Sequence, residues 1–388
     1  MSGFTGINIQ IFKDRVSKLT EKVIADDLDG VFLFSDEYRA GYTTYISDYK
    51  PINVIEESPQ GIFISQDQPV VLFLGAINAK AAAGVSWIED IRDIHTLESF
   101  FDNLREEKGR QLRIAICGEE LLPTKYYRMM QSALKDFDYV NWDWVLNEMR
   151  KIKSKDEIEL LQKAAEIGDQ ALKKAAERLK QTGNITEIDL CADSEYAMRL
   201  MGGDLGCATV LSSGENTAYP TWRPTHKEIE DGDLVIIDVG PSYRGYNSDV
   251  AITIVKGAAS KEQTEILETS KLIIAQTIDE LKTGDKASRI YDLFLEKSTA
   301  HGIAEFFEPY ARGVRAVGHS IGMDVVERPH LDKESDFLLE EGVILALKYD
   351  LRGLPWGGLR FECVAVMEEN GCRALNQILY GSQMVKKP

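Results

Sequence analysis

Four side chains that can bind a cation or move a proton lie at the ends of short apolar runs. Asp238 ends the run LVIID, and Asp249 begins the next run after a turn-rich connection, so a tight hairpin would bring both carboxylates together. His319 lies in GHSIG, and Glu362 follows GGLRF and leads into another apolar run. Each alone is more simply a strand-end carboxylate or a buried core histidine. Together, three carboxylates and one imidazole suit a hard or borderline divalent cation.

The surrounding pattern predicts an antiparallel sheet with helices packed on one side. A capping box at Ser154 and Glu157 begins a long helix whose apolar spacing continues to Leu179. Two hairpins are predicted, one from runs 234–238 and 250–255, the other from runs 343–347 and 363–367. We expect the second hairpin to be joined by a loop containing Gly353, Pro355, Gly357 and Gly358. Helical patterns at 261–282 and 287–301 lie between the hairpins, which indicates an α+β domain.

The first 150 residues have a different pattern. A helical stretch at 12–25 alternates with strand-like runs at 30–34, 61–65, 69–74 and 113–117, and this alternation predicts an α/β layer without a recognisable motif. A polar stretch at 150–156 separates the two patterns. We therefore predict two domains, 1–150 and 151–388.

Composition excludes several classes of function. The 388 residues are 44% hydrophobic and 28% charged, as in a globular protein, and the net charge of −18 with no basic block disfavours nucleic acids and anionic membranes. The N-terminus lacks a signal-peptide pattern, and five scattered cysteines without a CxxC pair predict reduced thiols in the cytoplasm. Cys363, beside Glu362, is the one cysteine considered for the site, although a small core residue is its simpler interpretation.

Several motifs resemble, in order, those of the pita-bread superfamily of creatinase, prolidase and aminopeptidase P, which is M24-like. They are DGDLVIIDVG at 231–240, YRGYNSD at 243–249, GHSIG at 318–322, EGVI at 341–344 and GGLRFE at 357–362. The resemblance runs from about residue 150 to the C-terminus and extends more weakly to the N-terminal half. It implies an α+β pita-bread catalytic domain preceded by a smaller creatinase/prolidase-type α/β domain.

The same resemblance implies a metal site that has been altered. In the metallopeptidases of the superfamily, Asp, Asp, His, Glu and Glu bind two divalent ions. Asp238, Asp249, His319 and Glu362 match four of these ligands, but Lys348 stands in the position of the remaining glutamate. At ~4 Å and an effective dielectric of ~20, each unit of charge repulsion costs about 4 kcal/mol, twice that for a divalent ion. We expect at most one ion, with Mn, Zn, Co and Fe not distinguished. Asp238, Asp249 and Glu362 would bind it; otherwise none is bound, and Lys348 pairs with the acids or faces solvent.

Two histidines expected from the resemblance are also replaced. Thr221 and Val326 occupy their positions, whereas the neighbouring Glu327 is retained. His226 and His330 lie close in sequence to these losses, but surface or loop histidines are the simpler interpretation. The catalytic candidates are Lys348, Glu327 and His319, and the substrate-binding candidates are Tyr219, Thr221, Trp222, Arg223, Val326 and Arg360.

Three functions remain open. The first is an enzyme that cleaves a C–N type bond in a small amide, N-acyl or guanidino-like substrate. The second is a metal-dependent Xaa-Pro aminopeptidase or dipeptidase, and the third is a non-catalytic protein that binds a ligand or peptide. The expected partners are a small molecule or short peptide and a second copy of the chain. In the implied homodimer, one N-terminal domain borders the partner's cleft near Trp222 and Arg223.

Overall fold

The computed structural model divides the chain into two compact units, Met1–Met149 and Arg150–Pro388. The boundary falls within helix α6 (Asp143–Lys151). The structure describes residues 3–52, 58–135, 139–181, 183–307 and 317–379. Across these ranges, no helix combines the length and the apolar character that crossing a bilayer requires.

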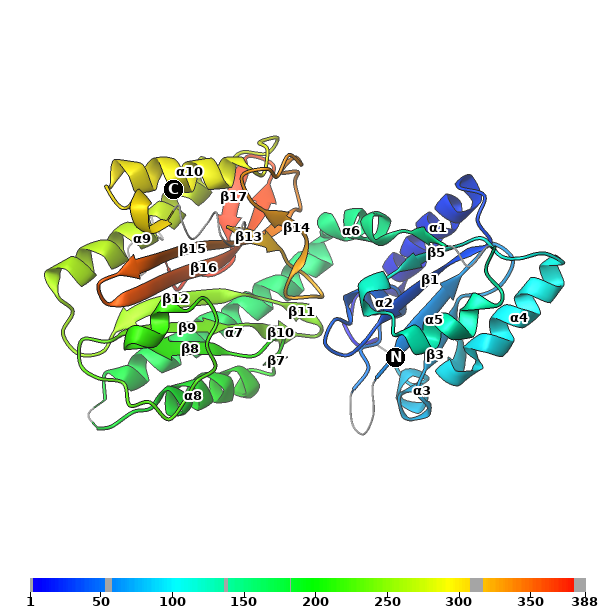
Figure 1. Cartoon of the computed structure of the whole chain (residues 1–388), viewed down its shortest axis with the longest axis horizontal. Coiled ribbons are helices and arrows are strands. Elements are labelled where there is room, and N and C mark those ends of the chain that lie inside the picture. Colours follow the sequence, from blue (N-terminus) through cyan, green and yellow to red (C-terminus); the bar gives the residue numbers. More distant parts are fainter. Residues whose placement is uncertain (1–2, 53–57, 136–138, 182, 308–316, 380–388) are drawn as a thin grey trace. The chain divides into compact units, whose positions relative to one another are not determined.

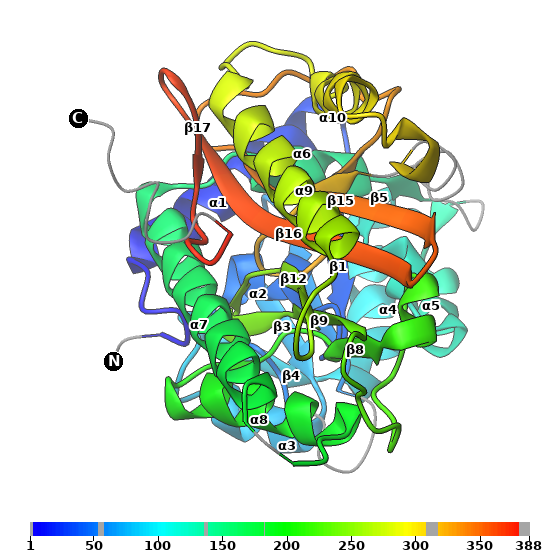
Figure 2. The same ribbon diagram turned by 90° about the vertical axis from the view of Figure 1, so that its left-hand side faces the viewer.

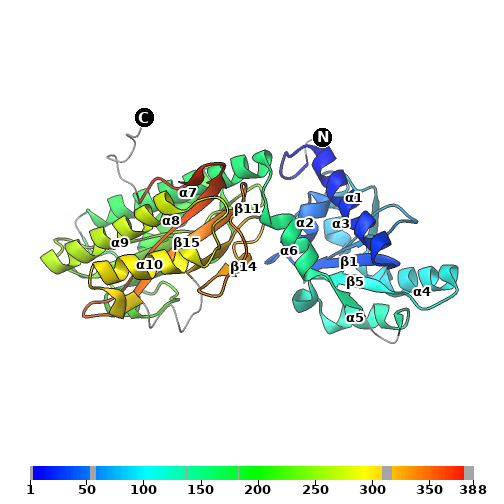
Figure 3. The same ribbon diagram turned by 90° about the horizontal axis from the view of Figure 1, so that it is seen from above.

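The N-terminal unit is a mixed six-stranded sheet covered by helices on both faces. Its strands lie in the order β4-β3-β2-β1-β5-β6, and Figure 3 shows α1, α2 and α3 on one side of β1 and β5, with α4 and α5 on the other. Alternate aromatic side chains of β1, Phe32 and Phe34, face the second side and contact Phe101 and Tyr126. The unit comprises α1 (Ile9–Ala25), β1 (Gly30–Ser35), α2 (Gly41–Ser47), β2 (Gln60–Ile64), β3 (Val71–Leu74), α3 (Ala76–Ala82), β4 (Asp90–Asp93), α4 (Leu97–Lys108), β5 (Ile114–Cys117), α5 (Thr124–Gln131) and β6 (Val140–Asn141).

The C-terminal unit is built on an eight-stranded antiparallel sheet (Figure 1). Seven strands follow the order β14-β13-β15-β16-β12-β9-β8, and β17 pairs with β16. A separate small sheet contains β7, β10 and β11. The strands are β7 (Asp204–Leu205), β8 (Val210–Ser213), β9 (Leu234–Val239), β10 (Pro241–Tyr243), β11 (Tyr246–Asn247), β12 (Val250–Val255), β13 (Gly318–Ser320), β14 (Glu327–Leu331), β15 (Ile344–Leu354), β16 (Gly357–Glu368) and β17 (Gly371–Ala374).

Four helices pack against this sheet: α7 (Lys155–Leu179), α8 (Glu187–Leu200), α9 (Lys261–Glu280) and α10 (Arg289–Ala300). The predicted capping box is present, because Ser154 accepts from the Glu157 backbone while the Glu157 carboxylate accepts from that of Ser154. Figure 2 views the unit with α7 and α9 in front of the strands. Residues of all four helices and of the long strands form one hydrophobic cluster, so the prediction of an antiparallel sheet with helices on one side is correct.

Strand alternation divides the sheet into an apolar face and a charged face. Leu345, Leu347 and Tyr349 of β15 belong to the hydrophobic cluster against the helices, as do Phe361 and Cys363 of β16. Because successive strand side chains point to opposite faces, the residues between them must point away from that core. Those intervening residues include Lys348, Asp350, Arg360 and Glu362.

The second hairpin differs from its predicted form. Pairing of β15 with β16 continues to Leu354 and Gly357, so only two residues lie between the strands. Gly353 and Gly357 have φ values of +83° and +117°, which residues with a Cβ rarely adopt, and the register shifts between Arg352 and Leu354. The glycines therefore shape the strand ends and do not form a long loop.

Candidate active site

A row of residues crosses the charged face of the sheet in register. Lys348 on β15 pairs with Glu362 on β16, Glu362 pairs with Ala251 on β12, and Ala251 pairs with Asp238 on β9. Asp249 lies two residues before Ala251, so its side chain is directed to the same face. The sheet register thus brings Glu362 beside Asp238 and Asp249, which lie more than 100 residues earlier in the sequence.

Lys348 lies inside this carboxylate cluster. Its Nζ is 3.0 Å from Glu362 Oε2, and only 22% of its side chain is exposed, whereas the Glu362 side chain is fully buried. Burial lowers the pKa of Lys348, but the charges of Glu362 and Asp249 outweigh this effect and raise the pKa overall. Burial and the charge of Asp249 also raise the pKa of Glu362 well above its usual value. Lys348 therefore places a fixed positive charge where the resemblance implies an acidic ligand.

Three donors of the cluster converge on one point. Ligand atoms of Asp249, His319 and Glu362 all lie within 4.8 Å of one another. His319 Nδ1 is 3.0 Å from the carbonyl oxygen of Ser320, so Nδ1 carries the proton in a neutral ring and Nε2 keeps its lone pair. That Nε2 is buried without a hydrogen-bond partner in the described chain, 3.4 Å from Asp249 and 3.8 Å from Glu362. Opposed lone pairs require a positive charge between them, either a proton or one divalent ion. These donors fit a single ion.

Asp238 is engaged elsewhere. Its Oδ2 accepts a hydrogen bond of 2.6 Å from Arg360, and burial followed by the charge of Asp249 raises its pKa to about 6. Among the described residues, the one group that could hold a metal ion consists of Asp249, His319 and Glu362, which are three of the four matched ligands and leave out Asp238. The reason is that Arg360 already neutralises Asp238. Lys348 and Arg360 place positive charge on the two flanks of the cluster, where they are ion-paired with Glu362 and Asp238.

Arg360 belongs to a network that sequence reasoning missed in part. Besides Asp238 it contacts Asp350, at 3.0 Å from Nε, and donates to the carbonyl oxygen of Pro220 at 2.9 Å. Asp350 is buried and also pairs with Arg352 at 2.9 Å. Burial raises its pKa, but the charges of Arg360 and Arg352 outweigh this effect and lower the pKa overall. The charged residues Lys348, Asp350 and Arg352 at every second position of the later half of β15 were the available signal for Asp350.

Glu327 lies apart from the three converging donors. Both of its carboxylate oxygens are ion-paired, one with Arg150 and the other with Lys153 at 3.0 Å. Arg150 also bonds Asp324 at 2.7 Å. Burial raises the pKa of Glu327, but the two cations outweigh it and lower the pKa overall. A carboxylate held in this way is suited to positioning β14, and its catalytic role rests on the resemblance alone.

The segment that carries the substrate-binding candidates is firmly anchored. Glu187, buried at the start of α8, accepts from the backbone and side chain of both Ser213 and Thr225, at 2.7–3.0 Å. Between these anchors, Tyr219 and Trp222 stack with ring centroids 5.1 Å apart, and Tyr219 is 55% exposed.

The other substrate-binding candidates lie near the surface. Thr221 and Arg223 are exposed, and Val326 is 52% exposed just before β14. Of the cysteines, Cys363 lies in the hydrophobic cluster on the helix side of the sheet, as its simpler interpretation predicted. The site acids act on two thiols: the pKa of Cys207 is raised by burial and then by Asp249 and Asp238, and that of Cys363 by burial and then by Cys372 and Glu362.

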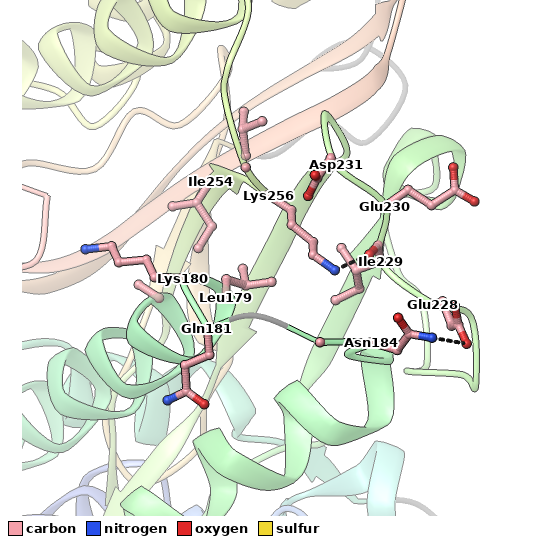
Figure 4. Close-up of a pocket in the computed structure, with 14 residues that line it drawn as sticks. Leu179, Lys180, Gln181, Asn184, Glu228, Ile229, Glu230, Asp231, Ile254 and Lys256 are labelled. Atoms are coloured by element: carbon pink, nitrogen blue, oxygen red, sulfur yellow. Dashed lines mark hydrogen bonds between the residues drawn. The ribbon is translucent and has the colours of Figure 1, made fainter.

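A large cavity is separate from these residues. It has a volume of about 1070 Å³, and Figure 4 shows that it lies between the end of α7, the segment before β9 and the end of β12. Its polar lining groups are largely satisfied, since Lys256 donates to the carbonyl oxygen of Ile229 at 2.6 Å and Asn184 donates to Glu228 at 3.2 Å. It contains none of the converging acids, so its size does not mark it as the reactive centre.

Comparison with known proteins gives a family match for each half of the chain. Residues 159–369 match the model of metallopeptidase family M24, and residues 15–152 match the model of the creatinase/prolidase N-terminal domain. The chain is 31% identical to an Xaa-Pro dipeptidase of Pyrococcus furiosus, over 94% of this chain and 98% of the relative. It is 25% identical to an Xaa-Pro dipeptidase of Lactobacillus delbrueckii subsp. lactis, over 92% and 95%.

Among solved structures, the prolidase of Pyrococcus horikoshii OT3 superimposes with a TM-score of 0.81 at 26% identity, covering 94% of this chain and 98% of that one. The expected pita-bread fold with a creatinase/prolidase-type N-terminal domain is therefore confirmed. The chain is a member of metallopeptidase family M24.

Proposed function

We propose that this protein hydrolyses a C–N bond in a small amide, N-acyl or guanidino-like substrate, using a site that takes one divalent ion or none. The observation that carries the proposal is the 3.0 Å contact between Lys348 and Glu362 at the centre of the site. A lysine at this point supplies permanently the positive charge that an ion would otherwise bring. The retained acids and His319 still provide groups that can hold and deprotonate water.

In the proposed reaction, each of these groups has one role. A water molecule held by Asp249 and Glu362 loses a proton to the Glu362 carboxylate as its oxygen attacks the substrate's carbonyl or guanidino carbon. The Lys348 ammonium stabilises the negative charge that develops at the attacked centre of an amide, as a preorganised cation does in a dry site. The C–N bond then breaks, and the proton on Glu362 passes to the leaving nitrogen. Arg360 keeps Asp238 in place and links the sheet to the substrate-binding segment through Pro220.

Asp249, His319 and Glu362 would hold an ion, which when bound would supply Lewis acidity to the attacked group or to water. The test is elemental analysis of protein purified without added metal, together with a hydrolysis screen of dipeptides, N-acyl amino acids and guanidino compounds. We expect at most one divalent ion per chain and turnover in at least one substrate class. Two tightly bound ions per chain would contradict a site with at most one ion. Binding of one of the screened compounds without its hydrolysis would favour a non-catalytic protein.

An Xaa-Pro dipeptidase is the second candidate, because relatives up to 31% identical carry that name. Lys348, Thr221 and Val326 oppose it, since each replaces a group that the resemblance assigns to ion binding or proton handling. The same screen separates the candidates: rapid hydrolysis confined to Xaa-Pro dipeptides would favour this second function.

A further inference from the structure

One buried carboxylate connects both ends of the segment that carries the substrate-binding candidates. Glu187 is the first residue of α8, and its side chain is buried. Oε1 accepts from the backbone N–H and the hydroxyl of Ser213 at 2.8 and 2.9 Å, and from Asn216 Nδ2 at 3.2 Å. Oε2 accepts from the backbone N–H and the hydroxyl of Thr225 at 3.0 and 2.7 Å. These hydrogen bonds occupy the roughly four lone-pair sites that a carboxylate offers.

Lys227 determines the direction of these hydrogen bonds. Its Nζ donates to Ser213 Oγ at 3.1 Å, and its backbone N–H donates to Thr225 Oγ1 at 3.2 Å. Both hydroxyl oxygens therefore accept from Lys227, and both hydroxyl protons are directed to Glu187. Hydrogen bonds to an ionised acceptor are roughly twice as strong as neutral ones. The ends of segment 213–225 cannot separate without leaving the Glu187 carboxylate buried and short of donors.

Between its two ends, the same segment is bonded to strand β16 at two points. Thr217 Oγ1 accepts from the backbone N–H of Gly358 at 2.9 Å, and the carbonyl oxygen of Pro220 accepts from Arg360 at 2.9 Å. Arg360 in turn donates to Asp238 at 2.6 Å, within the acid cluster. The exposed aromatic stack belongs to this part of the segment. A displacement of the segment would therefore move the stack and disturb the Arg360 network together.

We propose that Glu187 is a positioning residue for the reaction: by holding Ser213 and Thr225 together, it keeps the stacked Tyr219 and Trp222 side chains where the substrate binds. Glu187 is buried and acts through the segment, not on the substrate itself. This inference rests on the proposed function and adds to it the group that controls substrate affinity. The groups on the sheet act on the bond to be cleaved and keep their places when the segment is released.

The test compares the full-length parent with Glu187→Gln, in which an amide NH₂ replaces one of the two accepting oxygens. Hydrogen exchange followed by mass spectrometry measures segment 213–225 directly. We expect its amides to exchange at least about tenfold faster in Glu187→Gln, the effect of one lost hydrogen bond to a charged group. Asp169→Asn is the matched control, because this buried carboxylate of α7 holds a different segment, accepting from Asn376 and Gln377 at 3.0 and 2.6 Å. The control should leave the exchange of 213–225 unchanged.

Steady-state kinetics separate positioning from a purely structural role. The substrate is whichever of N-acetylglycine, glycylglycine and guanidinoacetate the parent hydrolyses fastest. In Glu187→Gln we expect KM to rise at least about tenfold while kcat stays within about twofold, because substrate binding is lost and the groups on the sheet are unchanged. Asp169→Asn should change neither constant. Thr225→Ser keeps the hydroxyl and should match the parent, whereas Thr225→Val has nearly the same shape without the hydroxyl and should raise KM.

The inference is overturned if Glu187→Gln leaves KM unchanged, whether or not the segment exchanges faster, since faster exchange alone shows only a structural role. A loss confined to kcat also overturns it. If Glu187→Gln does not fold, the two Thr225 variants carry the test, and equal KM values in both reject the positioning role. Absence of hydrolysis by the parent rejects the proposed function, whereas hydrolysis with a KM that Glu187→Gln does not change rejects only the role of Glu187.

Discussion

Replacing Lys348 by alanine removes the cation that neutralises a fully buried carboxylate. The Lys348–Glu362 contact is 3.0 Å long, which corresponds to roughly 5 kcal/mol of Coulomb energy at an effective dielectric of ~20. Breaking such a buried pair typically costs about 3–5 kcal/mol, because the remaining charge keeps its desolvation penalty. We therefore expect Lys348→Ala to lower the free energy of unfolding by about 3–5 kcal/mol near pH 8 in the presence of a chelator.

The loss of stability in Lys348→Ala should be larger at high pH than at low pH. The pKa of Glu362 is already raised by burial and by Asp249, and removing Lys348, which lowers it, raises it further. A buried acid with a raised pKa binds more protons folded than unfolded, so its charged form costs stability as the pH rises above its ordinary value of 4.5. Lys348→Ala should therefore be much closer to the parent at pH 5 than at pH 8.

Urea denaturation of the parent and two variants at both pH values measures this effect. Lys163→Ala is the matched control, because Lys163 forms a pair of 2.7 Å with Glu166 on an exposed helix face. We expect the control to unfold at the same urea concentration as the parent at both pH values, because an exposed ion pair is screened by solvent. If Lys348→Ala behaves like Lys163→Ala at pH 8, the ammonium does not compensate Glu362, and the electrostatic argument is refuted.

Lys348→Glu extends the same test to metal binding. Restoring an acid at this position completes the ligand set implied by the resemblance, so the variant should bind divalent ions more tightly than the parent, up to two per chain. Mass spectrometry and calorimetric titration with Mn²⁺ measure the stoichiometry. A variant that binds no more metal than the parent shows that position 348 is not a ligand position.

Three further outcomes are expected. Hydrolysis of Xaa-Pro dipeptides should be absent or feeble, because Thr221 and Val326 replace imidazoles and general acid–base catalysis is worth ~10²–10⁴-fold; a kcat above ~10 s⁻¹, the median for enzymes, reverses this ranking. Light scattering should show a homodimer at micromolar concentration, and a monomer contradicts the assembly implied by the resemblance. Burial and Asp249 raise the pKa of Asp238 from 3.8 to about 6, so the folded state binds the extra proton and stability should fall by roughly 3 kcal/mol as the pH rises through that interval. Chemical denaturation with a chelator should show a weaker fall for Asp238→Asn, and an equal slope in both proteins excludes Asp238 as its source.

Local features of this protein are determined by the sequence itself. The capping box of Ser154 and Glu157 begins α7 because its two hydrogen bonds join residues three apart. The alternation of apolar and charged residues in β15 and β16 places Lys348 and Glu362 on one face, since strand geometry repeats every two residues. The motif order was likewise sufficient to identify the family.

The grouping of these residues depends on contacts that no local pattern encodes. Arg150, which neutralises Glu327, lies 177 residues before it. The register of β14 against β13 places His330 opposite His319, although its sequence context predicts a loop. Arg360 pairs with Asp238 and leaves His319 to complete the candidate ion site. The two-residue period of a strand decides which face each side chain occupies. Which side chains become neighbours depends on the hydrogen-bond register between strands distant in sequence, and only the folded sheet determines that register.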